Sequence, residues 1–586
     1  MLANPLREAD LLSEKQVTFS SRWGMMIAML GMAVGTGNIW RFPRIAAANG
    51  GGSFLVAWVV FLLLWSVPLL LVEFSMGKAT RYGTVGAFIK LIGKRFAWMG
   101  AWVAWTATAI MFYYSVVAGW TLRYFWAGLT GELEGEIPGA LWANYAGSGW
   151  AVLTHAIAMG LGVWVVARGV RGIERAASVL IPSLFVLVIL LAVRAVTLPG
   201  AGGGIAFLFT PNLEQLADYR IWLQALTQNA WDTGAGWGLA LTYAIYMRPR
   251  EDTALNSFML GFGNNSVSLL AGIMVICTVF AVGPSLAGRI AASPAGFDQA
   301  IRAYPGLEGG LEAALRDLEP DEVRQRFGVV VTEEEIPGFF ANSAVPVETR
   351  LEIARATEAL DAETVSNAVL GSGNNGLTFI WVPQIFNTLP FSRVLTSLFF
   401  LALVFAALSS LIAMIELATR ILVDGGMARS RAISLVGTAG FLLGVPSALS
   451  MAVFDNQDWV WGVGLMLSGF FFAFAVVRYG VSRFREQFLN TPDSDLHVGA
   501  WWDVAIYLVL VQAVVLMVWW LYQAVDFADL GASLTLLSAF NVGTVLIQWG
   551  VALGAFLLLN NWLVRKTVIE GRGEEVTTGM IGSAPP

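Results

Sequence analysis

Apolar segments long enough to cross a lipid bilayer recur along the whole chain. A helix needs roughly 20 consecutive apolar residues to span the hydrocarbon core. Such segments lie at 24–48, 53–76, 98–127, 150–167, 177–197, 220–246, 255–282, 394–423, 431–453, 459–478, 500–523 and 540–564. Only 13% of the 586 residues are charged, about half the share in a soluble domain. We therefore expect an all-α integral membrane protein with twelve transmembrane helices.

Lysine and arginine are distributed unevenly between alternate loops. Positive residues follow the even-numbered spans, as with Lys94 and Arg95 after span 2 and Arg565 and Lys566 after span 12. By contrast, residues 124–167 contain three glutamates and no lysine or arginine in the loop and span that follow span 3. Because positive loops remain in the cytoplasm, both termini are predicted to be cytoplasmic.

One connection, at about 283–391, is far longer than the others. It is polar, carries both signs of charge and includes Glu333-Glu334-Glu335. Loops of this length in compact proteins usually have structure of their own. We expect an ordered extracellular subdomain, and its residues suggest a solvated cap or lid rather than a catalytic site.

Two of the apolar spans contain breaks rich in glycine. Residues 31–43 hold three glycines together with Asn38 and Arg41, and residues 231–238 hold three glycines beside Asp232. Each glycine weakens a helix by about 1 kcal/mol relative to alanine. Close packing through small residues would explain a lone glycine, but polar groups at membrane depth are costly and usually functional. Irregular backbone at this depth persists where it lines a cavity.

The two breaks occupy matching positions in two halves of five spans each. Glycine-interrupted helices at corresponding positions indicate a transporter built from inverted repeats, with its binding site between the broken helices 1 and 6. A channel would need polar residues along a continuous pore, whereas here they cluster at one depth. An enzyme is not expected, because His155 and His497 lie far from the breaks and Cys277 is the only cysteine.

Several separated motifs resemble the neurotransmitter:sodium symporter family, in particular its bacterial members with the LeuT-type fold. The motifs are residues 31–43 with Asn49-Gly50-Gly51-Gly52, Tyr113-Tyr114, Gly172-Ile173-Glu174-Arg175, Phe209-Thr210-Pro211, 228–246, Asn264, 406–410 and Asp458. Spans 11 and 12 match by number only. The resemblance implies a cytoplasmic segment 1–23, repeats at 24–197 and 198–478, a final helix pair at 479–565 and a cytoplasmic tail at 566–586, in a bacterial inner membrane.

The resemblance also implies two sodium sites beside the substrate. The first would use side-chain oxygens and one carbonyl, from Ala33, Asn38, Asp232 and Asn264. These are hard oxygen donors, as an alkali cation requires. The second would use carbonyls and two hydroxyls, from Gly31, Val34, Ala406, Ser409 and Ser410. Adjacent serines in a membrane helix often bond to their own preceding turn, so the resemblance alone assigns these two to sodium.

For the substrate, the family pattern places a carboxylate against the N–H groups of Thr36 and Gly37 and the hydroxyl of Tyr114, with Gly35 leaving room for it. The remaining expected wall residues are Ala33, Ile110, Trp231, Asp232, Gly234, Trp237, Ser410 and Met414. Membrane tryptophans are more often packing residues. If both indoles face the site, they form flat walls that suit an aromatic or a small substrate, and the sequence leaves this choice open.

Charged residues on either side of this region match the gates of the family. Arg41 and Asp458 resemble the outer pair, which would close over the substrate through one or two waters. Tyr246 and Asp424 resemble the inner gate. The usual arginine and tryptophan of the N-terminal segment correspond here to Gln16 and Phe19, so Lys15 or Arg22 is the alternative partner.

Asp232 replaces the threonine or serine that the family usually has at this position. Animal relatives bind chloride nearby, and many bacterial ones place a glutamate four residues after the span 7 asparagine. In this chain that position is Ser268, Gln228 is retained, and Trp58 stands at the usual chloride tyrosine. An anion and a fixed carboxylate would repel strongly in a cavity of low dielectric constant. We expect Asp232 to supply the negative charge, so that chloride is not required.

The function that the resemblance implies is sodium-coupled import of an amino acid or related small zwitterion by alternating access. A sodium-coupled transporter of an amine or betaine-type osmolyte is the alternative, and a ligand-binding membrane sensor is the alternative outside transport. The expected partners are a small-molecule substrate and the lipid bilayer, with no nucleic acid, and the protein is expected to be a monomer or homodimer.

Overall fold

The computed structural model describes residues 18–135, 138–303, 305–357, 375–492, 494–527, 530–535 and 538–567, and within them the chain forms helices and no strands. The helices that lie in the expected spans are α2 (Arg22–Ala33), η1 (Gly37–Arg41), α3 (Phe42–Ala48), α4 (Gly52–Phe61), η2 (Leu62–Ser66), α5 (Val67–Thr80), α7 (Ala97–Thr130), α10 (Gly149–Val166), α11 (Gly169–Val196), α13 (Tyr219–Asp232), α14 (Leu239–Ala244), α15 (Thr253–Ala292), α23 (Ser392–Asp424), α24 (Arg429–Leu449), α25 (Met451–Tyr479), α27 (Trp501–Gln523) and α29 (Val542–Leu558).

Shorter helices connect these elements at the two ends of the molecule. They are α6 (Thr84–Ile92), η3 (Lys94–Phe96), α8 (Glu132–Gly135), α9 (Pro138–Tyr145), α12 (Ala201–Phe209), η4 (Gln215–Ala217), α16 (Pro294–Ala303), α17 (Pro305–Arg316), α18 (Pro320–Phe327), α19 (Val347–Ala356), η5 (Gly376–Trp381), α22 (Val382–Phe386), α26 (Val481–Phe484), η6 (Arg485–Leu489), α28 (Leu530–Ser533) and α30 (Asn560–Thr567).

Each of the twelve expected spans consists mainly of helical residues. In the part of the chain that the structure describes, nine helices are long and apolar enough to cross a membrane, or ten if α29 and α30, which meet at 59°, form one span. The other two expected spans, 24–48 and 220–246, are interrupted and so contain no single helix of that length. The all-α membrane architecture is confirmed, and the number of twelve crossings stays a prediction.

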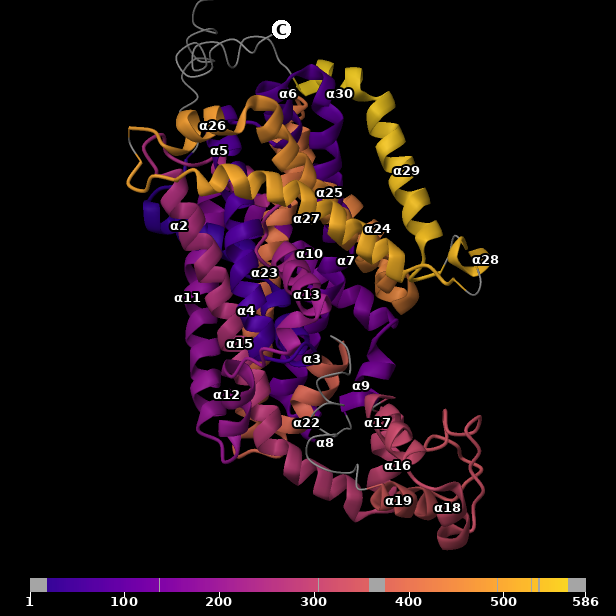
Figure 1. Cartoon of the computed structure of the whole chain (residues 1–586). Coiled ribbons are helices and arrows are strands. Elements are labelled where there is room, and N and C mark those ends of the chain that lie inside the picture. The colour runs from indigo at the N-terminus through magenta and orange to yellow at the C-terminus, as the bar shows by residue number, and fades with distance from the viewer. Residues whose placement is uncertain are drawn as a thin grey trace, which may run out of the picture.

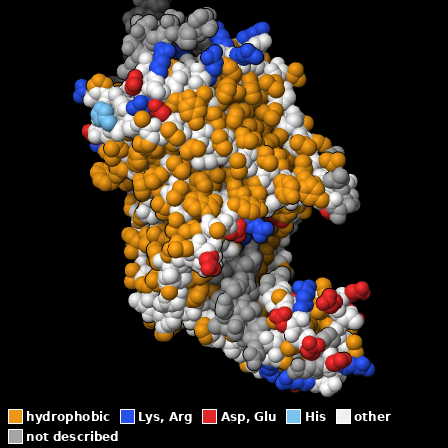
Figure 2. Space-filling view, viewed as in Figure 1, with side chains coloured by type: hydrophobic (Ala, Val, Ile, Leu, Met, Phe, Trp, Pro, Cys, Tyr) orange, Lys and Arg blue, Asp and Glu red, His pale blue; other side chains and the backbone are white. Residues whose placement is uncertain are grey.

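The helices form an elongated bundle with distinct ends. Figure 1 shows α16–α19 projecting from one end, while α26 and α30 lie at the opposite end. Hydrophobic side chains cover the middle of the face seen in Figure 2, and lysine and arginine gather at the end that carries α30. This distribution is typical of a membrane protein whose apolar middle section is surrounded by lipid.

Helix α7 runs through the interior and packs along α23, α10 and α25. Small residues allow this close approach. A Cβ atom at Gly119 would lie 2.7 Å from the backbone nitrogen of His155 in α10, closer than side-chain contacts permit. Glycine therefore lets the two helix backbones touch, as small residues do in other membrane bundles.

Both glycine-rich segments interrupt their helices, as predicted. Helix α2 ends at Ala33, and Val34 and Gly35 are non-helical before the chain turns into η1. Between α13 and α14, residues 233–238 are non-helical, and Gly234, Gly236 and Gly238 have φ angles of +68°, +87° and +77°. Glycine adopts such angles without the steric cost that other residues meet.

The second break is held by a buried carboxylate from α5. Glu73 is fully buried and accepts hydrogen bonds from the backbone N–H of Gly236 at 2.6 Å and of Leu241 at 3.2 Å. These donors lie in the break and at the start of α14, where backbone N–H groups have no partner within the helix. Glu73 thus replaces hydrogen bonds that the break removes.

The long connection contains the four helices α16–α19. Their buried apolar residues, which include Phe297, Leu311 and Leu351, are continuous with the core of the bundle, as is Phe340 between α18 and α19. Arg350 is buried and pairs with Asp298 at 2.9 Å. Residues 358–374 of the expected subdomain lie outside the described residues, and its extracellular location stays a prediction.

Candidate functional site

The two helix breaks face one cavity, whose empty volume of about 740 Å³ includes space open to solvent. All twelve residues predicted for the substrate line it, namely Ala33, Gly35, Thr36, Gly37, Ile110, Tyr114, Trp231, Asp232, Gly234, Trp237, Ser410 and Met414. The other lining residues are Met32, Asn38, Trp40, Arg41, Tyr113, Val117, Gln228, Leu239, Phe454 and Asp458. Residues from five separate segments of the chain thus meet here.

Tyr114 closes one side of the cavity against the first break. Its hydroxyl accepts a hydrogen bond from the backbone N–H of Thr36 at 3.2 Å. Gly35 is needed for this contact, because a Cβ atom there would lie 2.9 Å from Ser410 Oγ and 3.0 Å from the Tyr114 hydroxyl. The wall therefore presents a phenol, a serine hydroxyl and backbone N–H groups, which suit a carboxylate.

The two indoles of the cavity lie on the second break. Trp231 and Trp237 approach edge to face, with ring centroids 6.4 Å apart and planes at 73°. The indole N–H of Trp237 donates to the carbonyl of Ala230 at 3.2 Å, so this ring folds back over its own segment. The rings give the cavity two apolar walls at a steep angle to each other.

The residues predicted for the first sodium site form one connected chain of hydrogen bonds. Asn38 Nδ2 donates to Asn264 Oδ1 at 2.9 Å and to Ser268 Oγ at 2.8 Å. Ser268 Oγ in turn donates to Asp232 Oδ2 at 2.5 Å. Asn38 Oδ1 accepts from the backbone N–H of Gly35 at 2.8 Å. The oxygens of η1, α13 and α15 are thereby gathered beside Ala33, which also lines the cavity.

One oxygen of Asp232 is left without a partner. Its side chain is buried, and Oδ1 has no hydrogen-bond partner among the described residues. Buried polar atoms are almost always paired, and a carboxylate oxygen can be paired only by a donor or a cation. A small cation or the ammonium group of a ligand meets this need.

The residues predicted for the second sodium site converge on the carbonyl of Val34. Ser409 Oγ lies 3.3 Å and Ser410 Oγ 3.2 Å from this oxygen, and Ser409 Oγ also lies 2.9 Å from the carbonyl of Ala406. Gly31 packs against Ser409, where a Cβ atom would meet the serine Cβ at 3.3 Å. The hydroxyls therefore reach across to the first break rather than bonding only within α23.

The predicted outer pair lies at the rim of the cavity. Arg41 and Asp458 both line it, and the structure shows no direct ion pair between these two described residues. The guanidinium of Arg41 lies over the ring of Trp231, 4.6 Å from its centroid. The water-mediated pair expected from the sequence stays a prediction.

At the opposite side the predicted inner residues have different partners. The hydroxyl of Tyr246 donates to Glu416 Oε1 at 2.6 Å, and Arg429 binds Glu416 Oε2 at 2.6 Å. Asp424 pairs with Arg420 at 2.7 Å and accepts from the backbone N–H of Gly83 at 2.6 Å. Glu416 lies two turns before Asp424 on α23, and the Tyr246 hydroxyl donates to Glu416 instead of Asp424.

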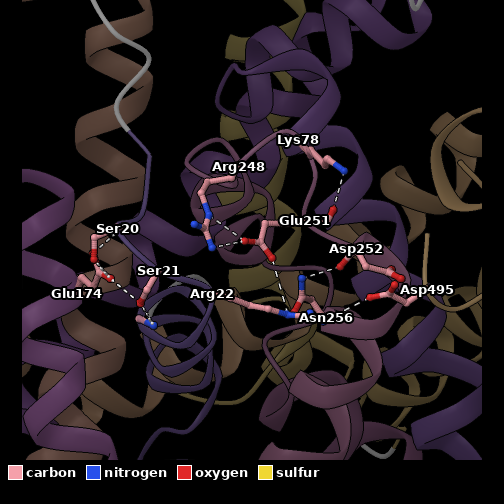
Figure 3. A network of polar contacts seen from close by, with 11 residues as sticks. Ser20, Ser21, Arg22, Lys78, Glu174, Arg248, Glu251, Asp252, Asn256 and Asp495 are labelled. Atoms are coloured by element: carbon pink, nitrogen blue, oxygen red, sulfur yellow. Dashed lines mark hydrogen bonds and ion pairs between the residues drawn. The ribbon is translucent and has the colours of Figure 1, made fainter. Parts of the chain in front are cut away.

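The N-terminal segment is tied to this side by a second polar network (Figure 3). Ser20 binds Glu174 through its backbone N–H at 3.0 Å and its hydroxyl at 2.5 Å. Arg22, the alternative partner named above, lies 3.8 Å from both Glu251 and Asp495. Lys15 and Gln16 lie outside the described residues. Phe19 is buried and packs edge to face against Tyr246.

Two of the predicted anion-site equivalents adjoin Asp232, and the third, Trp58, contacts another aromatic ring. Ser268 binds Asp232 directly, and Gln228 lines the cavity one turn before Asp232 on α13. Trp58 instead packs against Phe42, with ring centroids 4.6 Å apart, and its indole N–H has no hydrogen-bond partner among the described residues. The hydroxyl that would face an anion, that of Ser268, donates its proton to the carboxylate of Asp232.

Three charged residues that the sequence reasoning missed take part in these networks: Glu73, Glu416 and Arg429. Glu73 and Glu416 both lie inside expected apolar spans. An ionisable residue within such a span is itself a signal of function, and this signal would have found them. Their partners are 163 and 170 positions away along the chain, so sequence spacing could not identify the pairs.

Comparisons with known proteins agree with this geometry. The profile of the sodium:neurotransmitter symporter family matches residues 16–147 and 144–569. An uncharacterised sodium-dependent transporter of Methanocaldococcus jannaschii is 25% identical over 516 residues, covering 83% of this chain and 86% of the relative. An uncharacterised sodium-dependent transporter of Bacillus subtilis is 36% identical over 277 residues, covering 46% of this chain and 61% of the relative.

A solved structure shares the fold. The crystal structure of MhsT in complex with L-phenylalanine matches with a TM-score of 0.64 and 26% identity, covering 86% of this chain and 99% of that chain. A human sodium-dependent neutral amino acid transporter is 27% identical over 307 residues, covering 46% of this chain and 42% of that protein. The likeness extends along nearly the whole length of the solved structure.

Proposed function

This chain belongs to the sodium:neurotransmitter symporter family and is a sodium-coupled transporter, and on that premise we propose that it imports an amino acid or related small zwitterion by alternating access. The observation that carries the proposal is the convergence of both helix breaks on one cavity. Such a cavity, between broken helices near the middle of the bundle, is where transporters of this architecture bind substrate and coupling ion.

For the substrate we favour a zwitterion, with its carboxylate against Tyr114 and the N–H groups of Thr36 and Gly37. The phenol of Tyr114, which lies within hydrogen-bond reach of the Thr36 N–H, and the space that Gly35 leaves beside it support that orientation. The substrate's ammonium group would lie toward the second break, and its side chain between Ile110, Met414 and the indoles. An amine or betaine remains the second candidate, because the unpartnered Asp232 Oδ1 could itself bind a substrate cation.

We further propose two sodium sites. The connected oxygens of Asn38, Asn264 and Asp232 support the first, and the convergence of Ser409 and Ser410 on the Val34 carbonyl supports the second. Both sets consist of carbonyl, amide, hydroxyl and carboxylate oxygens, which suit a hard cation. Sodium binding at either set would hold the first break against a helix of the opposite half.

Chloride independence is part of the proposal. Ser268 has a single O–H, and it is donated to Asp232 Oδ2 at 2.5 Å. A chloride ion at this place would compete for that proton and would lie beside a fixed negative charge, which is strongly unfavourable at low dielectric constant. Asp232 therefore supplies the charge that balances sodium, and no second anion is needed.

We also propose that the protein lies in the bacterial inner membrane with both termini in the cytoplasm. The first repeat would comprise 24–197 and the second 198–478, with 479–565 as a peripheral helix pair. The lysine and arginine residues at the end of the bundle that carries α30 support this orientation. The protein would act as a monomer or homodimer, with the bilayer and its substrate as partners.

The test is thermal stabilisation of the purified protein by a panel of amino acids, amines and betaines, with sodium or with potassium. A ligand that raises the melting temperature only with sodium supports the proposal, since a ligand that binds the folded state alone stabilises it. A zwitterion that stabilises more than its decarboxylated amine supports the favoured orientation. Stabilisation that is independent of sodium for every compound would contradict the coupling.

A further inference from the structure

Gly462 leaves a notch in α25 that receives the edge of the Trp231 indole. A Cβ atom at Gly462 would lie 1.8 Å from Trp231 Cζ2 and 2.2 Å from Cη2. These distances are far shorter than any non-bonded contact. The φ angle of Gly462 is not positive, so the backbone does not require a glycine here. The space taken up by the indole requires it.

The Trp231 indole also has neighbours on its other sides. Arg41 lies over the Trp231 ring, and Trp237 meets it edge to face. Asp458 stands one turn before Gly462 on α25, and it lines the cavity that Arg41 and Trp231 also line. Helix α25 therefore contributes two features to this rim, a carboxylate near the arginine and a notch for the indole.

We propose that Gly462 is the positioning residue that lets Trp231 close the outer side of the cavity. When α25 packs over the cavity, the notch seats the indole beneath Arg41. A side chain at position 462 displaces the indole and leaves the cavity open. The inference rests on the proposed function for which side is the outer one, but its test needs neither transport nor a known substrate.

Two neighbouring changes separate this role from general packing. A Cβ atom at Gly464, two residues further along α25, would lie 3.4 Å from Thr106 Cγ2 and 3.5 Å from Trp102 Cζ2, which is ordinary contact. Gly464→Ala is therefore the matched control. Trp231→Phe removes the outer ring of the indole, to which Cζ2 and Cη2 belong, and should relieve the collision in a Gly462→Ala background.

The experiment measures access to a cysteine inside the cavity. Val117→Cys places a thiol on the lining from α7, in a chain whose only native thiol, Cys277, is buried and is replaced by alanine. Intact cells are treated with a charged, membrane-impermeant methanethiosulfonate reagent in sodium buffer. Gly462→Ala should raise the labelling rate about tenfold, because overpacking of this kind shifts an equilibrium by an order of magnitude or more. Gly464→Ala should leave it unchanged.

The double variant shows whether faster labelling of Gly462→Ala comes from its collision with the indole. Trp231→Phe with Gly462→Ala should label at the rate of Trp231→Phe alone. Equal labelling of Gly462→Ala and its parent would overturn the inference while leaving the sodium-dependent stabilisation test untouched. Should Gly462→Ala fail to fold, recovery of folded protein in the double variant supports the collision with the indole. Failure of the double variant, when Trp231→Phe folds, would contradict it.

Discussion

Asp232 is the one carboxylate among the residues predicted for the substrate and for sodium, and it lines the cavity. One oxygen takes the proton of Ser268 and the other has no partner among the described residues. An uncharged serine or threonine at this position would leave the Ser268 hydroxyl free to face an anion. The identity of this one residue therefore decides which charges the cavity needs from solution.

Replacing this carboxylate should create a need for chloride. In Asp232→Ser the fixed charge is lost and the Ser268 O–H becomes available to an anion. We expect wild-type uptake in proteoliposomes to persist when gluconate replaces chloride, and uptake by Asp232→Ser to fall at least about tenfold in the same exchange. Loss of wild-type uptake without chloride would contradict the proposed role of Asp232.

Removing the amide of Asn38 should weaken sodium binding. Asn38→Ala deletes an oxygen ligand and the two hydrogen bonds that hold Asn264 and Ser268 in place. We expect a sodium affinity about 5- to 150-fold lower, from a loss of about 1–3 kcal/mol, measured by sodium titration of the melting temperature. Asn49→Ala, which removes a bond to the carbonyl of Ile45 within α3, is the control. Unchanged sodium affinity in Asn38→Ala would exclude this residue from the site.

At the scale of elements, the two breaks were predictable and their supports were not. Three glycines with a polar residue inside an apolar span indicate an interrupted helix, and the interruptions lie at Val34–Gly35 and at 233–238. All twelve residues that the sequence predicted for the substrate line the cavity. Sequence reasoning assigned no role to Glu73 or Gly462, because each contacts a segment 163 or more positions away and only packing brings them together.

Glu73 should stabilise the second break as an element. Glu73→Gln retains one oxygen, but it loses one acceptor for the two N–H groups of the break. A buried N–H left without a partner costs about 1–3 kcal/mol, so we expect a melting temperature several degrees lower. Glu214→Gln, at an exposed position, serves as control. Equal melting temperatures for Glu73→Gln and wild type would show that the break is held by other contacts.

At the scale of the whole molecule, the cavity is closed by different chemistry at its two sides. The outer rim combines an indole, a guanidinium and a carboxylate that are not directly paired. The inner side is closed by the buried Glu416 with Tyr246 and Arg429 and by the Ser20–Glu174 contact. The directly paired side is the firmer of the two, so in the proposed orientation the molecule is closed toward the cytoplasm.

Breaking the inner pair should shift the molecule toward an inward-open form. Glu416→Gln leaves Arg429 without its carboxylate, which commonly costs about 3–5 kcal/mol for a buried pair. We expect faster thiol labelling of Val117→Cys from the cytoplasmic side and a lower melting temperature. The double variant Glu416→Gln/Arg429→Gln should recover part of the stability because no charge is left unpaired. A double variant no more stable than Glu416→Gln would contradict a direct pair.

The fixed charge of Asp232 has an electrical consequence for transport. Under the proposed function, a zwitterion enters with two sodium ions and adds two positive charges. Arg41 and Asp458 cancel and an ionised Asp232 contributes one negative charge, so the loaded cavity would carry +1 and the empty one −1. A potential of 100 mV, negative inside, acts on each such charge with about 2.3 kcal/mol. It drives the loaded cavity inward and the empty cavity back outward. Voltage would then accelerate both halves of the cycle, whereas a carrier with a neutral empty cavity responds in one half only.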